Sequence, residues 1–224
     1  MKNIFVILGY GIPKDILRDE PSRRYLGLVF NSVYKISLEK GDKKSIIVFT
    51  GGNSDIFKPF KRTEATEIKK LFLAFANRPF VKNYTKNWCY KIEARSLSTL
   101  ENIINVNEVV KKIKGPKRVY VFCEFTRAEK VKIFTRRIIK NNFQIIPIDF
   151  DLSLNRYLSP DFIHKKESVD IKLGIKALRN KKFYSKYKDI FKERIEFLRK
   201  AGTKHHREAV KKWWESKLQE LSSL

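Results

Sequence analysis

The stretch Ile46-Ile47-Val48-Phe49-Thr50-Gly51-Gly52-Asn53 is a short apolar run that passes directly into two glycines and a polar side chain. Apolar runs of this length, bounded by turn residues, are typical of buried strands. Three more apolar runs lead into polar or glycine-containing motifs: Ile4–Leu8 into Gly9-Tyr10-Gly11, Cys89–Ile92 into residues 93–102, and Val119–Phe122 into residues 124–128. Ligands bind at the carboxyl ends of the strands in an open α/β sheet, so we expect these motifs to converge on one pocket.

The segments between these runs show helical periodicity, and one further strand is predicted after the last helix. The spacing of apolar residues predicts helices near Arg23–Glu39, Glu64–Ala76, Thr99–Lys112 and Arg127–Lys140, and a fifth strand at Gln144–Ile148. Strands alternating with helices of about 10 to 15 residues are typical of βαβ units. The sequence therefore predicts an α/β protein, a three-layer α/β/α Rossmann-like sandwich with a mostly parallel sheet of about five strands.

The pattern changes after Asp151. No further strand is indicated, and two or three basic helices are predicted around Ser168–Leu178, Tyr184–Lys200 and His205–Leu218. We therefore expect a Rossmann-like domain at residues 1–151 and a basic α-helical extension at residues 152–224, packed on that domain. The alternative for Trp213-Trp214 is an exposed basic and aromatic surface for a partner helix, a membrane or RNA.

The composition is strongly basic, with 49 Lys and Arg against 24 Asp and Glu and a net charge of +25. Such a surplus favours nucleic acid, an acidic membrane surface or anionic metabolites as partners. Lysine is interspersed with Ile and Asn throughout, however, so a compositionally biased and solvated surface explains the charge equally well. No apolar run approaches the roughly 18 to 20 residues of a membrane-spanning helix, and the first one is too short for a signal peptide. We expect a cytoplasmic protein.

The glycine motifs suggest close approach of the backbone to a ligand. Gly51-Gly52 can bend sharply and present N–H groups to an anion, helped by the N-terminus of the helix that begins near Glu64. Gly9-Tyr10-Gly11 does not complete the dinucleotide-binding fingerprint, because Lys14 stands where a third glycine is expected, and no Walker-type loop is present. The usual forms of NAD binding and ATP hydrolysis are therefore disfavoured.

Two other motifs carry side chains suited to ligand binding. The segment from Glu93 to Asn102 places a carboxylate, hydroxyls and an amide at a strand end and on the first helical turn, with Ser98 and Glu101 at capping-box spacing. These groups can bind ribose hydroxyls, a metal or a phosphate. Arg127, at the start of the next helix, is a natural anion clamp because guanidinium binds oxyanions in a bidentate manner.

Taken together, these motifs resemble those of the YdcF-like family (SanA, ElyC and YdcF), a Rossmann-like group of largely unknown function. The resemblance spans about residues 4–150 and rests on Leu8-Gly9, Arg24, Thr50-Gly51-Gly52, Thr63-Glu64-Ala65, Glu93, Thr99-Leu100-Glu101-Asn102 and Arg127-Ala128. It implies a polar pocket for a nucleotide-like ligand, with S-adenosylmethionine as a candidate, and some relatives look tied to envelope precursors and polyprenyl carriers.

One position departs from the family pattern. Glu124 stands where the family has a histidine, three residues before the arginine. A glutamate can act as a base or bind a metal, but it repels a phosphate. Acid–base chemistry that depends on the family histidine is therefore not carried over to this chain.

The leading hypothesis is a domain that binds a nucleotide-like or phosphorylated small molecule at the strand ends. The expected ligand contacts are Gly9, Gly11, Asp15, Arg24, Gly51, Gly52, Asn53, Ser98, Thr99, Asn102, Thr126 and Arg127, and the candidate catalytic residues are Glu64, Glu93 and Glu124. A second hypothesis is a phosphate-ester hydrolase or transferase assisted by a divalent cation, because carboxylates bind hard cations. A third is a protein that binds RNA or a membrane surface through charge alone. The sequence alone does not identify which residues would bind a metal.

Overall fold

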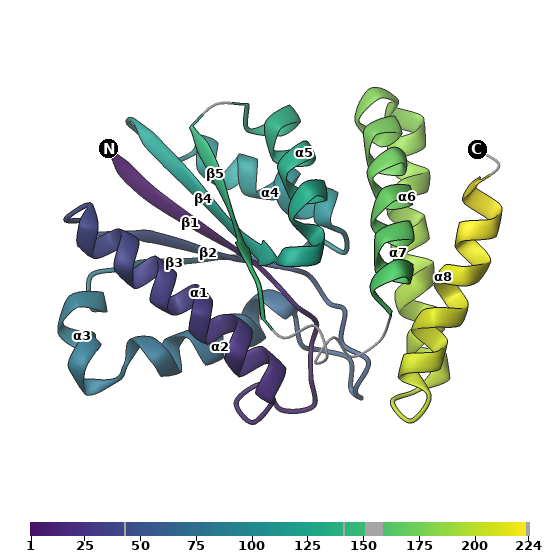
Figure 1. The fold of residues 1–224 in the computed structure, drawn as a ribbon, viewed down its shortest axis with the longest axis horizontal. Coiled ribbons are helices and arrows are strands. Elements are labelled where there is room, and N and C mark those ends of the chain that lie inside the picture. The colour runs from purple at the N-terminus through teal and green to yellow at the C-terminus, as the bar shows by residue number, and fades with distance from the viewer. Residues whose placement is uncertain (43, 141, 151–158, 223–224) are drawn as a thin grey trace.

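The computed structural model describes residues 1–42, 44–140, 142–150 and 159–222 (Figure 1). A single five-stranded parallel sheet runs in the order β3-β2-β1-β4-β5. The strands are β1 (Lys2–Leu8), β2 (Ile46–Thr50), β3 (Cys89–Glu93), β4 (Lys117–Glu124) and β5 (Phe143–Ile148). The predicted α/β class and parallel sheet are confirmed.

Helices cover both faces of the sheet, and three more stand beside it. The helices are α1 (Glu20–Glu39), α2 (Glu64–Ala76), α3 (Pro79–Thr85), α4 (Thr99–Lys111), α5 (Ala128–Ile138), α6 (Pro160–Arg179), α7 (Lys181–Ala201) and α8 (His206–Ser222), with a short 3₁₀ turn η1 (Phe125–Arg127) before α5. Figure 1 shows α1 and α2 on one face, α4 and α5 on the other, and α6 to α8 beyond α5. The Rossmann-like sandwich with a C-terminal helical extension is therefore present.

The central strand shows why this sequence makes a three-layer fold. Every residue of Ile4–Leu8 is fully buried, as a parallel strand covered on both faces requires. Because side chains alternate along a strand, Ile4 and Val6 join the core beneath α4 and α5, whereas Phe5 joins the core beneath α1 and α2.

The helix caps agree with the sequence, but several boundaries do not. Thr63 and Ser98 cap α2 and α4 as predicted, each accepting a backbone N–H with its hydroxyl. The helix expected near Arg23 begins at Glu20, because the Asp19 side chain caps it and Pro21 is accommodated in the first turn.

Two helical segments were placed wrongly or missed by the sequence analysis. The helix expected from Ser168 begins at Pro160, where the Ser159 hydroxyl caps it, and α3 was not predicted at all. Both helices have a proline in their first turn, a position where a proline is tolerated.

Helices α6 to α8 share a hydrophobic core with α4 and α5. Gly174 of α6 allows close contact with α5, since a Cβ atom there would lie 2.3 Å from Phe134 Cζ. Trp213 and Trp214 are buried, so they are packing residues and do not form an exposed aromatic surface. The predicted boundary between residues 151 and 152 lies outside the described residues. Among the helices described, none has the length and apolar character needed to cross a membrane.

Candidate functional site

A cavity of about 240 Å³, lined by many polar side chains, lies between the carboxyl ends of the strands and helices α6 to α8. From the α/β layers it is lined by Tyr10, Gly11, Ser54, Glu64, Ser96, Leu97, Ser98, Thr99, Asn102, Glu124, Thr126, Arg127 and Lys130. From the C-terminal helices it is lined by Ile163, Lys166, Glu167, Asp170, Phe191, Arg194, Val210 and Trp214. Loops that follow four different strands thus meet at one place, as the spacing of the motifs predicted.

The cavity brings together about half of the predicted site residues. Those that line it are Gly11, Glu64, Ser98, Thr99, Asn102, Glu124, Thr126 and Arg127. Those that do not are Gly9, Asp15, Arg24, Gly51, Gly52, Asn53 and Glu93.

Asp15 and Arg24 lie away from the cavity, in surface positions. Asp15 accepts the Leu17 N–H and pairs with Arg18 in a separate depression. Arg24 pairs with Glu20, one helical turn earlier on α1, at 3.2 Å. Both residues stabilise local structure in the loop before α1 and on its first turns.

Asn53 connects the loop after β2 to the C-terminal helices. Its amide Nδ2 donates to the Phe60 carbonyl, and its Oδ1 accepts from Arg199 Nη2 at 2.7 Å. Arg199 Nε also donates to the Asp55 carbonyl at 2.9 Å. This loop is therefore fixed against α7.

The first glycine after β2 makes room for a carboxylate of the protein itself, and the second lies against the backbone of residues 94–96. A Cβ atom at Gly51 would lie 2.4 Å from Glu64 Oε2. The Gly51 N–H donates to the Glu93 carbonyl and the Gly52 N–H to the Ser96 carbonyl, at 3.0 and 2.6 Å. The N–H groups that were expected to face an anion therefore already have acceptors.

Glu64 itself lies in the first turn of α2 and lines the cavity. The Gly11 N–H donates to its carboxylate. Burial raises the pKa of Glu64, and the Gly11 hydrogen bond and the charge of Arg127 offset this only in part.

Glu93 is buried beneath the loop that joins β3 to α4. Its carboxylate accepts from the Arg95 N–H at 2.8 Å, the Ser96 hydroxyl at 2.5 Å and Asn105 Nδ2 at 3.0 Å. It organises this loop and does not reach the cavity.

Glu124 and Arg127 hold the turn between β4 and α5. Glu124 accepts from the N–H of Thr126 at 2.9 Å and also from its hydroxyl. Arg127 Nη2 donates to the Gly9 carbonyl at 2.7 Å, and its Nε lies 3.8 Å from Glu124 Oε2. Burial lowers the pKa of Arg127, but the neighbouring anionic groups, Glu124 foremost, raise it overall.

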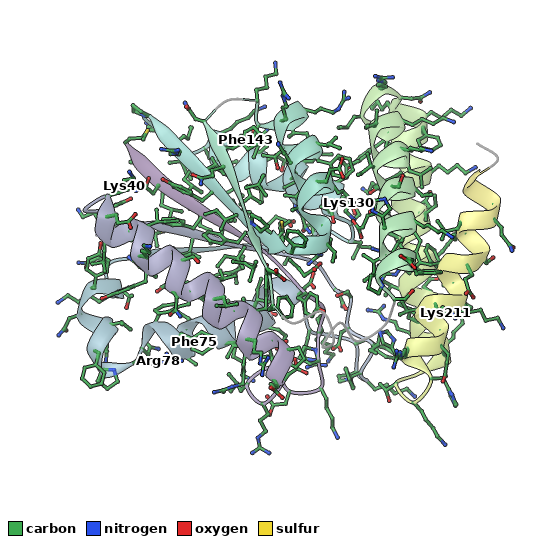
Figure 2. The ribbon with its side chains drawn as sticks, viewed as in Figure 1. Lys40, Phe75, Arg78, Lys130, Phe143 and Lys211 are labelled. Carbon is green, nitrogen blue, oxygen red and sulfur yellow. The ribbon has the colours of Figure 1, made fainter. Side chains whose placement is uncertain are left out.

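The C-terminal helices add a buried ionic cluster that the sequence analysis did not predict. Lys130 Nζ of α5 lies 2.6 Å from both Glu167 Oε2 and Asp170 Oδ2, and Figure 2 shows Lys130 between α5 and these helices. Asp170 also accepts the Tyr187 hydroxyl at 2.8 Å, and Lys166 pairs with Glu167. The positive charges of both lysines are thus met by carboxylates.

Arg194 of α7 is the exception among the basic groups of the cavity wall. Its guanidinium forms no hydrogen bond or ion pair with any described residue, and its Nε is buried. The guanidinium carbon lies 5.7 Å from the centre of the Trp214 ring, a cation–π contact. Burial lowers the pKa of Arg194, and the more distant carboxylates, Asp170 first, offset this only in part.

A signal for these residues is present in the sequence. In α6, Glu167 and Asp170 occupy positions of the helical stripe whose other members, such as Leu173, are buried and apolar. In α7, Arg194 falls between the buried Phe191 and Ile195. A charged side chain in the apolar stripe of an amphipathic helix marks a buried polar site, and this spacing could have identified it.

The predicted carboxylates are not gathered into a cation site. Over the described ranges, no group of three or more His, Cys, Asp or Glu side chains is placed to hold a metal ion. Glu101, like Glu93, is engaged in its own loop, where it accepts the Leu97 N–H at 3.0 Å.

Fold and cavity together define a Rossmann-like α/β protein whose strand-end pocket is walled by its own C-terminal helices. No family model, curated protein or solved structure matches the chain. Membership of the YdcF-like family stays a prediction from the sequence motifs.

Proposed function

We propose that this chain is a cytoplasmic, YdcF-like protein that binds a small anionic molecule, phosphorylated or nucleotide-like, in the cavity beside Arg194. The observation that carries the proposal is the half-buried Arg194 guanidinium, whose Nε is buried without a hydrogen-bond partner and which has no counter-ion among the described residues. An unpaired buried charge is strongly unfavourable, and a bound oxyanion would neutralise it. The planar guanidinium fork matches phosphate and carboxylate oxygens.

The distribution of charge in the wall supports this assignment. Lys130 and Lys166 are paired with carboxylates of α6, and Arg127 is held by Glu124 and the Gly9 carbonyl. Among the described residues of the cavity wall, Arg194 is the cation that remains free to bind a ligand. The charge of Arg127 lies close enough to act on Arg194, and it adds to the positive potential there.

The α/β side of the wall also carries carboxylates. Glu64 and Glu124 line it, so a ligand with one anionic group and otherwise neutral or cationic groups fits better than a polyanion. S-adenosylmethionine, which has one carboxylate and positive centres, and a phosphate monoester both meet this condition.

Binding is tested by calorimetric titration of the full chain with inorganic phosphate, S-adenosylmethionine, S-adenosylhomocysteine and nucleoside monophosphates. The variant Arg194→Met removes the unpaired charge, and Lys192→Met removes an equal charge from an exposed position of the same helix. A charged hydrogen bond contributes roughly 1.5–3 kcal/mol, so Arg194→Met should weaken binding by about ten- to a hundredfold, with Lys192→Met close to the unaltered protein.

Equal losses in the two variants, with binding that collapses in salt, would instead assign the affinity to the basic surface. That result would favour the charge-driven binding of RNA or membranes. Binding unaffected by Arg194→Met would remove the proposed site.

A second candidate function is hydrolysis or group transfer on the bound phosphate ester. It is favoured by Glu64, a partly buried carboxyl with a raised pKa on the cavity wall, because such groups are frequent in catalytic sites. Turnover of a phosphate-ester panel, with and without magnesium or manganese, tests it, and Glu64→Gln should abolish any activity found.

A further inference from the structure

Two uncharged polar atoms of the cavity wall are also buried without a hydrogen-bond partner. They are Nε1 of Trp214, a residue that is 2% exposed, and Oδ1 of Asn102, a residue that is 7% exposed. A buried polar atom left unpaired costs about 1–3 kcal/mol, so nearly all such atoms in folded proteins have partners. Both atoms belong to residues that line the cavity, and a ligand there can supply the missing partners.

The two atoms differ in chemistry and in position. The indole N–H is a donor only, whereas the amide oxygen is an acceptor. Trp214 belongs to α8, where edge-to-face contacts with Trp213 and Phe191 fix its ring. Asn102 lies in the first turn of α4, where its N–H donates to the Ser98 carbonyl at 3.0 Å. The donor therefore comes from the C-terminal helices and the acceptor from the α/β layers.

The two unpartnered donors of the cavity wall both lie on the helical side. Trp214 Nε1 lies on the ring that stacks with Arg194, whose Nε is the other unpartnered donor. Two neighbouring donors, one of them charged, suit the oxygens of a phosphate.

The unpartnered acceptor, by contrast, lies on the side of the strands. Asn102 Oδ1 shares that wall with the carboxylates of Glu64 and Glu124. These groups accept hydrogen bonds from hydroxyls and repel a second phosphate. The volume of about 240 Å³ also falls below the roughly 300–1,000 Å³ typical of pockets for drug-sized ligands.

We infer that the ligand is a small polyhydroxylated phosphate monoester, a sugar or polyol phosphate. Its phosphate accepts from Arg194 Nε and Trp214 Nε1, and one of its hydroxyls donates to Asn102 Oδ1. This inference rests on the proposed anion site and names the class of molecule that fills it.

The test compares two probes of equal charge and carbon number, glycerol 3-phosphate and n-propyl phosphate, by calorimetry on the full chain, with inorganic phosphate as a third probe. Glycerol 3-phosphate should bind at least about tenfold more tightly than n-propyl phosphate, because only its hydroxyls satisfy the amide oxygen. Equal affinities for the two esters would overturn the inference.

Two variants, each with a control on the same helix, locate the effect. Asn102→Leu should abolish the preference for glycerol 3-phosphate and leave n-propyl phosphate unchanged, whereas Asn107→Leu, on the same helix outside the cavity, should preserve it. Trp214→Phe should weaken all three probes by a similar factor, and Trp213→Phe should not. A preference that survives Asn102→Leu would contradict the inference.

The outcomes separate this inference from the anion site on which it rests. In one outcome, inorganic phosphate and both esters bind, binding is lost in Arg194→Met, and the two esters bind equally well. This outcome would retain the anion site and reject the polyol ligand. If none of the three probes binds, both the anion site and the polyol inference are rejected for phosphate ligands.

Discussion

The Glu64 carboxylate lies where a side chain at Gly9 would have to be: a Cβ atom there would lie 2.1 Å from Glu64 Cδ. Gly51 borders the same carboxylate from the end of β2. The carboxylate is thus enclosed by the ends of two adjacent strands, with the Gly11 N–H as donor. Glycines that were predicted to approach a ligand instead approach a side chain of the protein.

Gly9→Ala should therefore destabilise the protein by about 1–3 kcal/mol, because Glu64 must leave its hydrogen bond with Gly11 or the strand end must shift. The double variant Gly9→Ala/Glu64→Ala should recover much of this loss. Urea denaturation measures both. Gly27→Ala is the control, since a Cβ there meets only Phe75 at 3.9 Å, and in mid-helix it should be neutral or stabilise by up to about 1 kcal/mol. A purely additive double variant would show that the contact does not limit the strand end.

The pKa of Glu64 makes stability depend on pH. Because burial raises the pKa in the folded state, the protonated carboxyl stabilises the fold fully below the unfolded-state pKa, about 4.3. That contribution is lost as pH rises through the folded-state pKa. Glu64→Gln mimics the protonated form, so its stability relative to the unaltered protein should rise with pH and then level off.

Free energies of unfolding between about pH 4 and pH 8 measure this difference. Glu129→Gln, on the exposed face of α5, is the control and should give a small difference that varies little over the same range. A Glu64→Gln difference that stays flat, or falls as pH rises, would contradict the assignment.

The strands and their parallel arrangement were predictable because local signals agree with the global fold. The run at Ile4–Leu8 is buried on both faces, so its sequence is apolar without alternation, and Ser98 with Glu101 caps α4 as their spacing indicated. Glu93 shows the limit of such reasoning. Its place at a strand end suggested catalysis, but its carboxylate accepts hydrogen bonds from Ser96 and Asn105. These contacts depend on the path of one loop, which the sequence pattern does not give.

Lys130→Met should destabilise the protein by about 3–5 kcal/mol, because it leaves two buried carboxylates without their shared cation. Although burial opposes it, the charges of Lys130 and Lys166 lower the pKa of Glu167 overall. Lys132→Met, an exposed position two residues away, removes the same charge and should change stability by no more than about 0.5 kcal/mol. Chemical denaturation compares the two, and similar small effects would show that the cluster adds little to stability.

The half of the site formed by α6 to α8 could not be placed from sequence alone. Charged residues such as Asp170 and Arg194 fall in apolar stripes, which indicates burial but not against what. Their partner surface is defined by tertiary contacts far apart in the chain, among them Lys130 with Asp170.

Trp214 gives the cavity an optical signal of its own. The chain has three tryptophans; Trp88 lies in the core on the α1 and α2 side, and Trp213 does not line the cavity. An anion that accepts from Trp214 Nε1 and draws Arg194 from the indole ring should alter tryptophan emission during titration with inorganic phosphate. The change should persist in Trp88→Phe and vanish in Trp214→Phe. If Trp214→Phe keeps the full response, the anion does not bind against the α8 wall, and Arg194 must meet its ligand elsewhere.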